Sequence, residues 1–189
     1  MKHPKCLFRR QFKNGKQFTI DDHVSNTFKW VMDGDGVATE KVDGMCCAII
    51  DGKLHRLMNR KTAEALGIAY VDPDPMKKRW DVWVEVDETE LDGRWLYRAF
   101  VNTPWCREDG TYEAVGPHFK GNPYGLDDDF LERHGRIKHD VPRTYDGIKE
   151  YLRTHEIEGL VFWRGKEVGC QICRKDFGFP WPVKGDKDV

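Results

Sequence analysis

A lysine with the surroundings of a covalent nucleophile stands in the run Glu40-Lys41-Val42-Asp43-Gly44. Residues two apart in a β-strand share a face, so we expect Lys41 and Asp43 to point the same way, together with Thr39. Gly44 has no side chain and lets the backbone approach a ligand closely. A Lys-x-Asp-Gly motif arises by chance in about one chain in twenty of this length. Alone, the motif therefore also fits a solvated strand end that turns at Gly44.

A lysine amine attacks phosphorus only in its neutral form. With an ordinary pKa near 10.4, only about one lysine in a thousand is neutral at pH 7. Neighbouring cations, a bound metal ion or loss of solvent must therefore lower the pKa of such a nucleophile. The motif thus predicts cations and carboxylates contributed by distant parts of the chain, although each candidate alone also fits an ordinary surface residue. The candidates are Arg56, Arg60, Lys61, Glu113, Glu158, Arg174 and Lys175.

Strand-like segments outnumber helical ones along the chain. Asp51-Gly52 and Arg164-Gly165-Lys166-Glu167 each separate two such segments and predict hairpin turns. Thr144–Thr154 is predicted to form a helix capped by Thr144, and Asp127–His134 a short helix that begins with acidic residues. Because strands and helices do not alternate regularly, we expect an α+β fold with mainly antiparallel sheets. The predicted strands are Cys6–Arg9, Val37–Val42, Cys46–Ile50, Leu54–Met58, Trp83–Val86, Tyr112–Val115, Leu160–Trp163 and Gly169–Cys173.

Length and composition fit a single domain over residues 1–189. The chain has 31 Lys and Arg against 32 Asp and Glu, so it lacks the overall basic footprint of many nucleic-acid-binding proteins. Basic residues nevertheless gather between Lys2 and Lys16. No apolar run approaches the roughly 18 residues that cross a bilayer, and no apolar stretch follows the basic start as in a secretory signal. We therefore expect a cytoplasmic protein without a membrane partner.

The six cysteines are predicted to be reduced thiols, because no secretory signal is recognised. Cys170 and Cys173 form a C-x-x-C motif that would supply half of a zinc site. The other half is hard to find, since Cys46 and Cys47 are adjacent and Cys106 is alone. Small buried apolar residues are the simpler interpretation, with structural zinc as the alternative.

The order of the chemical residues resembles that of the covalent nucleotidyltransferases, the ligases and capping enzymes that share motifs I, Ia, III, IV and V. More closely, the chain resembles the small ATP-dependent 5′-to-3′ RNA ligase family, over nearly its whole length, from about Pro4 to Pro182. The matching stretches are Trp30-Val-Met-Asp-Gly-Asp-Gly-Val-Ala-Thr-Glu-Lys-Val-Asp-Gly44, Gly110-Thr-Tyr-Glu-Ala-Val-Gly-Pro-His118, Gly121-Asn-Pro-Tyr-Gly125, His134-Gly135, Glu158-Gly-Leu-Val-Phe162 and Arg174-Lys-Asp-Phe-Gly178.

This resemblance implies a ligase-type nucleotidyltransferase fold with few helices, in which two mainly antiparallel sheets flank the nucleotide. It implies ATP with Mg²⁺ or Mn²⁺, and RNA with 5′-phosphate and 3′-hydroxyl ends as the partner, without an obligate protein partner. The lysine takes AMP from ATP and releases pyrophosphate. AMP then passes to the RNA 5′-phosphate, and the 3′-hydroxyl displaces it to seal the ends. RNA repair is the expected setting.

The resemblance also assigns roles to residues of motif I. Lys41 would be the nucleophile that carries AMP, and Asp43 would belong to the catalytic group. Glu40 would lie against the adenine, and Gly44 would line the nucleotide site.

Further residues match the later motifs. Arg56 would be the nucleotide-binding arginine of motif Ia, with Arg60 as the second choice. Glu113 would be the motif III acid that contacts the ribose or orients the site. Glu158 would be the motif IV acid, binding Mg²⁺ directly or through water.

Motif V departs from the family pattern. The family usually carries a lysine and a second basic residue where this chain has Gln171 and Cys173. Glutamine can hydrogen-bond a phosphate oxygen but carries no charge, so both phosphate stabilisation and the lowering of the Lys41 pKa should be weaker. Arg174 or Lys175 is expected to compensate.

Alternative functions remain open at this point. The departure in motif V also fits an impaired ligase homologue that binds nucleotide or RNA ends without catalysis. A GTP-using guanylyltransferase shares the lysine motif. A plain structural domain, which would bind no nucleotide, is the remaining alternative.

Overall fold

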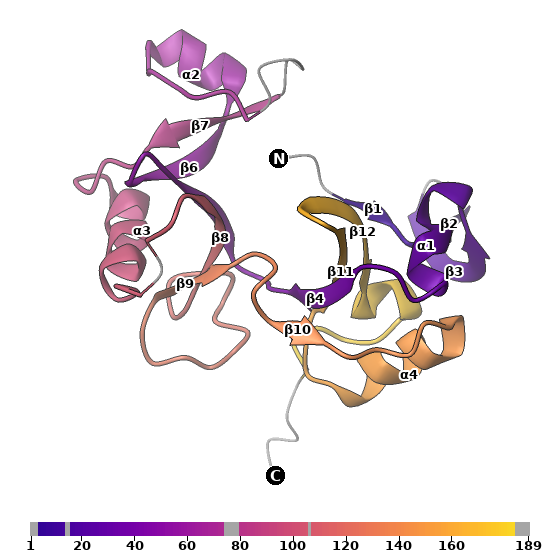
Figure 1. Ribbon diagram of the computed structural model, residues 1–189. Helices are drawn as coiled ribbons and strands as arrows, with labels where there is room; N and C mark the ends of the chain where they lie inside the picture. Colours follow the sequence, from indigo (N-terminus) through magenta and orange to yellow (C-terminus); the bar gives the residue numbers. More distant parts are fainter. Residues whose placement is uncertain (1–3, 14–15, 74–79, 106, 184–189) are drawn as a thin grey trace. The chain divides into compact units, whose positions relative to one another are not determined.

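The computed structural model describes residues 4–13, 16–73, 80–105 and 107–183 (Figure 1). The described residues divide into a central unit, Asp43–His134, and a flanking unit made by residues 4–42 and 135–183. Each unit contains a large, mainly antiparallel sheet, which confirms the predicted α+β class. Chain length and composition predict a single domain, and the division into two units does not test this prediction. Within the described ranges, no helix is long and apolar enough to cross a membrane.

The sheet of the flanking unit has the order β1-β12-β11-β4-β10. Neighbouring strands are antiparallel except β1, which is parallel to β12. The predicted turn at Arg164-Gly165 joins β11 to β12, and Gly165 has a φ of 62°, which suits glycine. The strands are β1 (Lys5–Cys6), β4 (Val37–Lys41), β10 (Lys138–His139), β11 (Gly159–Arg164) and β12 (Glu167–Cys173).

One face of this sheet is the core of the flanking unit. Leu160, Phe162 and Ile172 are fully buried there. Helix α4 (Tyr145–Thr154) contributes Ile148 and Leu152 to the same core. Its predicted cap is present, because the Gly147 N–H donates to Thr144 Oγ1 at 3.0 Å. The opposite face of the sheet carries the candidate nucleophile.

A hairpin of β2 (Phe8–Lys13) and β3 (Lys16–Val24) adds Phe8 and Ile20 to this core. The predicted strand Cys6–Arg9 is therefore two strands, which separate at Leu7. The remaining elements are η1 (Asn26–Phe28), α1 (Lys29–Met32) and η2 (Arg174–Phe177).

The sheet of the central unit has the order β7-β6-β5-β8-β9. The predicted turn Asp51-Gly52 joins β5 to β6 with φ angles of 51° and 74°. Figure 1 shows α3 beside β8 and β9, and Leu96 and Ala99 of this helix pack on Tyr112. The elements are β5 (Met45–Ile50), β6 (Lys53–Asn59), α2 (Arg60–Leu66), β7 (Asp81–Glu85), α3 (Leu91–Val101), β8 (Gly110–Val115) and β9 (Phe130–Arg133).

The helix predicted over Asp127–His134 is wrong, because this segment contains β9. Leu131 is buried and pairs with Ala114 of β8, so the alternation of a strand decides the conformation. Asp129 does not begin a helix. Its buried carboxylate accepts hydrogen bonds from the His118 backbone N–H at 3.2 Å and bonds the His118 ring at 2.8 Å.

Candidate active site

Lys41 is the last residue of β4 in the flanking unit. Thr39 lies on the same face, as predicted, while Ala38 and Glu40 point to the other. Asp43 lies beyond the end of the strand, so strand alternation does not decide the direction of its side chain, and the face it shares with Lys41 stays a prediction. The strand stops because Gly159, the partner of Lys41, is the first residue of β11.

Lys41 Nζ forms an ion pair with Glu158 Oε2. The Glu158 side chain is only 9% exposed, against 24% for Lys41. Glu158 directly precedes Gly159, which puts the carboxylate at the end of β4 where Lys41 stands. A side chain at Gly159 would meet the Ile172 carbonyl oxygen at 2.3 Å, so only glycine lets the strands approach this closely. The structure thus brings together the predicted nucleophile and the predicted metal-binding acid.

Gln171 and Cys173 lie on the same sheet face as Lys41. The register aligns Lys41 with Gly159 and Cys173 across three strands, and Thr39 with Gln171 in the row beside it. Burial raises the pKa of the Cys173 thiol to about 12, so this side chain is neutral at physiological pH. Neither residue supplies the positive charge that motif V usually provides on this strand.

Arg10 of β2 is a cation near this row that the sequence did not reveal. Its guanidinium holds the fully buried carboxylate of Asp176 at 3.0 Å, and Asp176 in turn accepts the Cys173 backbone N–H at 2.9 Å. Cys6, the strand partner of Gln171, is a second neighbour of Arg10. Burial raises the pKa of the Cys6 thiol to about 11, and the charges of Asp176 and Arg10 act on it in opposite directions. The only signal for Arg10 was the basic cluster from Lys2 to Lys16, of which Lys2 lies outside the described residues.

Arg174 does not compensate for the missing motif V cation. Its side chain is buried, and its guanidinium donates to the carbonyl oxygens of Leu152, His155 at 2.7 Å and Pro180 at 2.9 Å. These contacts hold the end of α4 to the segment after β12. Lys175, in contrast, is exposed, and its charge acts to lower the pKa of Cys173.

Replacing Arg174 with methionine is expected to lower the free energy of unfolding by about 2–4 kcal/mol, because buried carbonyl oxygens lose their donors. Equilibrium urea unfolding measures this change. Lys175→Met is the matched control at an exposed site and should shift stability by no more than about 0.5 kcal/mol. Equal effects of the two changes would contradict the structural role of Arg174.

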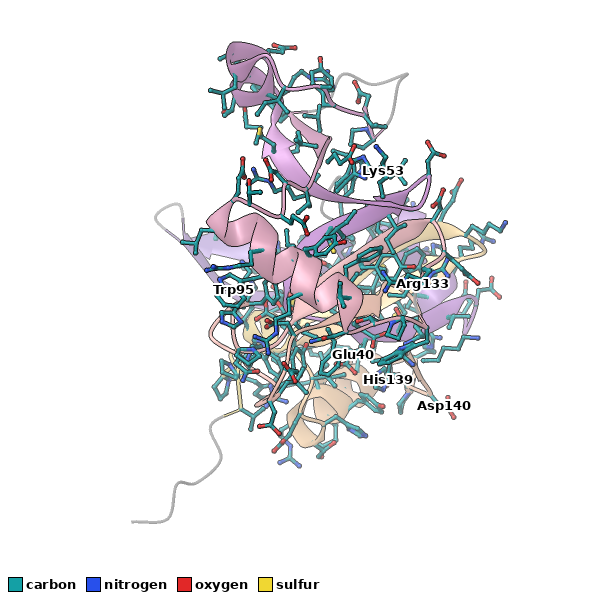
Figure 2. All side chains as sticks on the ribbon, turned by 90° about the vertical axis from the view of Figure 1, so that its left-hand side faces the viewer. Glu40, Lys53, Trp95, Arg133, His139 and Asp140 are labelled. Carbon is teal, nitrogen blue, oxygen red and sulfur yellow. The ribbon has the colours of Figure 1, made fainter. Side chains whose placement is uncertain are left out.

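Glu40 lies on the face of β4 opposite Lys41. Figure 2 shows its side chain next to His139, and Glu40 Oε2 lies 3.4 Å from His139 Nε2. Burial lowers the pKa of His139, whose Nδ1 lies 2.9 Å from the Tyr151 hydroxyl. The side chain of Glu40 thus contacts β10, and its role toward adenine stays a prediction.

Glu113 stands on β8 of the central unit, directly opposite Cys46 of β5. Its Oε1 lies 3.0 Å from His134 Nε2. Its Oε2 is buried and has no hydrogen-bond partner among the described residues. His134 Nδ1 is held in turn by Thr111 Oγ1 at 2.8 Å. A carboxylate and an imidazole are therefore fixed side by side on one face of this sheet.

Arg56 lies on the opposite face of the central sheet from Glu113. It pairs with Cys47 in the register, whereas Glu113 pairs with Cys46. Its guanidinium forms an ion pair with Glu90, next to the start of α3. The sheet thus separates Arg56 from Glu113 by its own thickness.

Arg60, the second choice for motif Ia, is also engaged within the central unit. It begins α2, is buried, and bonds Asp72 at 2.5 Å and the Tyr70 hydroxyl at 3.2 Å. The nucleotide-binding roles of Arg56 and Arg60 stay predictions.

Gly44 and Asp43 are fixed by backbone contacts of the central unit. A side chain at Gly44 would meet the Ala114 carbonyl oxygen at 2.4 Å, so the glycine is required by strand packing. The Asp43 N–H donates to the Tyr124 hydroxyl at 2.8 Å. Tyr124 was not singled out, although it stands in the Gly121-Asn-Pro-Tyr-Gly125 stretch that resembles the RNA ligases.

The C-x-x-C cysteines do not form half of a metal site. Cys170 and Cys173 are three apart on β12, so they point to opposite faces, and Cys170 belongs to the buried core. Cys106 lies outside the described residues. The described cysteines are free thiols, as predicted.

Comparison of this chain with models of known protein families finds no match, and no curated protein matches its sequence significantly.

Proposed function

We propose that this protein is an ATP-dependent RNA ligase of the nucleotidyltransferase type, which joins 5′-phosphate and 3′-hydroxyl ends through a lysyl-AMP intermediate. The observation that carries the proposal is the ion pair between Lys41 and the buried Glu158, on the sheet face opposite the core. These residues stand in the order that the resemblance assigns to the nucleophile and the metal-binding acid. The ion pair positions the amine but favours its charged form, so Lys41 must exchange this contact before it can attack.

The first step follows from the chemistry of the amine. Lys41 Nζ gives up a proton to solvent and attacks the α-phosphorus of ATP. The new N–P bond forms as the bond from that phosphorus to the bridging oxygen breaks, and pyrophosphate leaves with the electron pair. Glu158 keeps Nζ at the strand end, so the attacking atom is positioned before the nucleotide arrives.

Glu158 also fits the ion that the reaction requires. Mg²⁺ prefers carboxylate oxygens together with phosphate oxygens, and Glu158 offers a buried carboxylate beside the nucleophile. Bound there, Mg²⁺ or Mn²⁺ would offset phosphate charge and favour the neutral form of Lys41. Holding such an ion requires Glu158 to exchange its contact with the lysine ammonium.

The missing motif V cation is supplied by Arg10 in this proposal. Gln171 faces the row of Lys41, and Arg10 stands beside its strand partner Cys6. An arginine presents several N–H donors in a fixed plane and suits a phosphate group. The ion pair with the Asp176 carboxylate holds that guanidinium in place. The role of Glu113 toward the ribose stays a prediction.

The proposal is tested by the intact mass of the protein after incubation with ATP and Mg²⁺. Wild type is expected to gain one AMP, and Lys41→Ala is expected to gain none, because the nucleophile is absent. GTP in place of ATP should give no adduct, which separates the ligase from a guanylyltransferase. Wild-type protein that binds ATP but acquires no AMP would contradict the proposal.

A gel assay with 5′-phosphorylated RNA separates the ligase from a binding protein. The ligase converts the RNA to sealed product when ATP is present, and Lys41→Ala does not. A protein that only binds RNA ends would shift the RNA to lower mobility without sealing it.

A further inference from the structure

A cluster in the central unit combines three metal-binding side chains from three adjacent strands or their ends. Cys46 of β5, Glu113 of β8 and His134 after β9 each offer one ligand atom, and these atoms lie within 4.8 Å of one another. The ligand atoms of a tetrahedral zinc site are roughly 3.5 Å apart. Glu113 Oε1 and His134 Nε2 are already 3.0 Å apart, and side-chain rotation can bring the remaining separations to this value.

The sheet register brings these residues together. Cys46 and Glu113 are direct cross-strand partners, so their side chains stand next to each other on one face. Glu132 of β9 pairs with Glu113 on its other side.

Two hydrogen-bonding features point to a ligand beyond the protein's own groups. Glu113 Oε2 is buried and has no partner among the described residues, although a buried carboxylate oxygen normally has one. Thr111 Oγ1 holds His134 Nδ1 at 2.8 Å, which leaves Nε2 facing Glu113. The second ring nitrogen of a metal-binding histidine usually has a hydrogen-bond partner of its own, and Thr111 Oγ1 provides one here.

We propose that Cys46, Glu113 and His134 form a Zn²⁺ site in the central unit. A thiolate, an imidazole and a carboxylate together suit Zn²⁺, whereas Mg²⁺ disfavours sulfur. Cys46 releases its thiol proton as the S–Zn bond forms. Three protein ligands leave the fourth position of the ion to water or to a ligand.

The site is tested with Co²⁺, which reports thiolate ligation by its absorption. Wild-type protein without nucleotide is expected to bind one Co²⁺ per chain with a thiolate-to-metal absorption band, and Zn²⁺ should displace it. Cys46→Ser should weaken binding by about 100-fold or more. Cys6→Ser, a partly buried thiol of the flanking unit, is the matched control and should bind as wild type does.

His134→Gln provides a second ligand variant in case Cys46→Ser does not fold, and circular dichroism establishes the fold of each chain. Folded wild type that binds no Co²⁺ in a one-to-one ratio would overturn the site. Binding that survives in both folded ligand variants would overturn it as well.

Zinc should also affect the reaction, a consequence that rests on the proposed function. Glu113 is the acid assigned to the ribose, so Zn²⁺ is expected to slow lysyl-AMP formation in wild type and not in Cys46→Ser. Binding without inhibition would support the metal site and contradict the role of Glu113 toward nucleotide. Inactivity of the wild type would leave the Co²⁺ result to decide the site.

Discussion

Replacing Glu158 with glutamine is expected to slow lysyl-AMP formation by about 10²- to 10³-fold. Glu158 Oε2 is the carboxylate oxygen in contact with Lys41 Nζ. The amide keeps the shape of the side chain but carries no negative charge, so it holds the ammonium weakly and is a poor ligand for Mg²⁺. Transfer of labelled AMP from ATP to the protein, sampled over time, gives the rate.

Glu156→Gln is the matched control for this change. Glu156 lies two residues earlier on the exposed surface, so its amide variant should react as wild type does. Thermal unfolding of both variants separates a slower reaction from a damaged fold. A folded Glu158→Gln protein that reacts at the wild-type rate would remove Glu158 from the mechanism.

Replacing Arg10 with alanine should have a smaller effect, a fall in kcat/KM for adenylylation of about 10- to 100-fold. This is the contribution of one hydrogen bond to a charged group. Arg10 is the cation that stands beside Cys6, the strand partner of Gln171, where motif V would place a lysine. The rate is measured over a range of ATP concentrations, well below the unfolding temperature.

The Gln171→Lys change distinguishes catalysis from stability. Arg10→Ala also removes an ion pair of the buried Asp176, so some loss of stability is expected. Adding Gln171→Lys to Arg10→Ala should recover most of the rate, because the lysine restores a cation on the Lys41 face. Arg9→Ala, which removes the exposed ion pair with Asp21, should leave the rate unchanged. Failure of Gln171→Lys to raise the rate in a folded protein would mean that Arg10 is only structural.

Elements with a strong local signal were predictable. The Asp51-Gly52 turn adopts positive φ angles that Gly and Asp tolerate, so the hairpin of β5 and β6 follows from two residues. Thr144 caps α4 because its side chain satisfies an N–H within the same turn. Both outcomes depend on neighbours a few positions apart, which the sequence displays directly.

Elements that depend on distant partners were predicted poorly. The acids at Asp127–Asp129 favour a helix start, yet pairing with β8 makes Phe130–Arg133 a strand. Helix α3 was not anticipated, although it packs Leu96 on the central sheet. These outcomes follow from burial against segments far along the chain, and a local pattern carries little information about such contacts.

The sequence by itself determined the α+β class, the strand that carries Lys41, the face shared by Gln171 and Cys173, and the order of acids along the chain. The tertiary structure alone decided what these residues meet. Strand register brought Glu158 to Lys41 and placed Cys46 opposite Glu113, while it put Arg56 on the other face of its sheet. Arg174 is buried, and its guanidinium donates to backbone carbonyl oxygens such as that of His155. The alternation of side chains along a strand depends on neighbouring residues in the sequence. Which strands pair, and in which register, depends on packing across the whole fold.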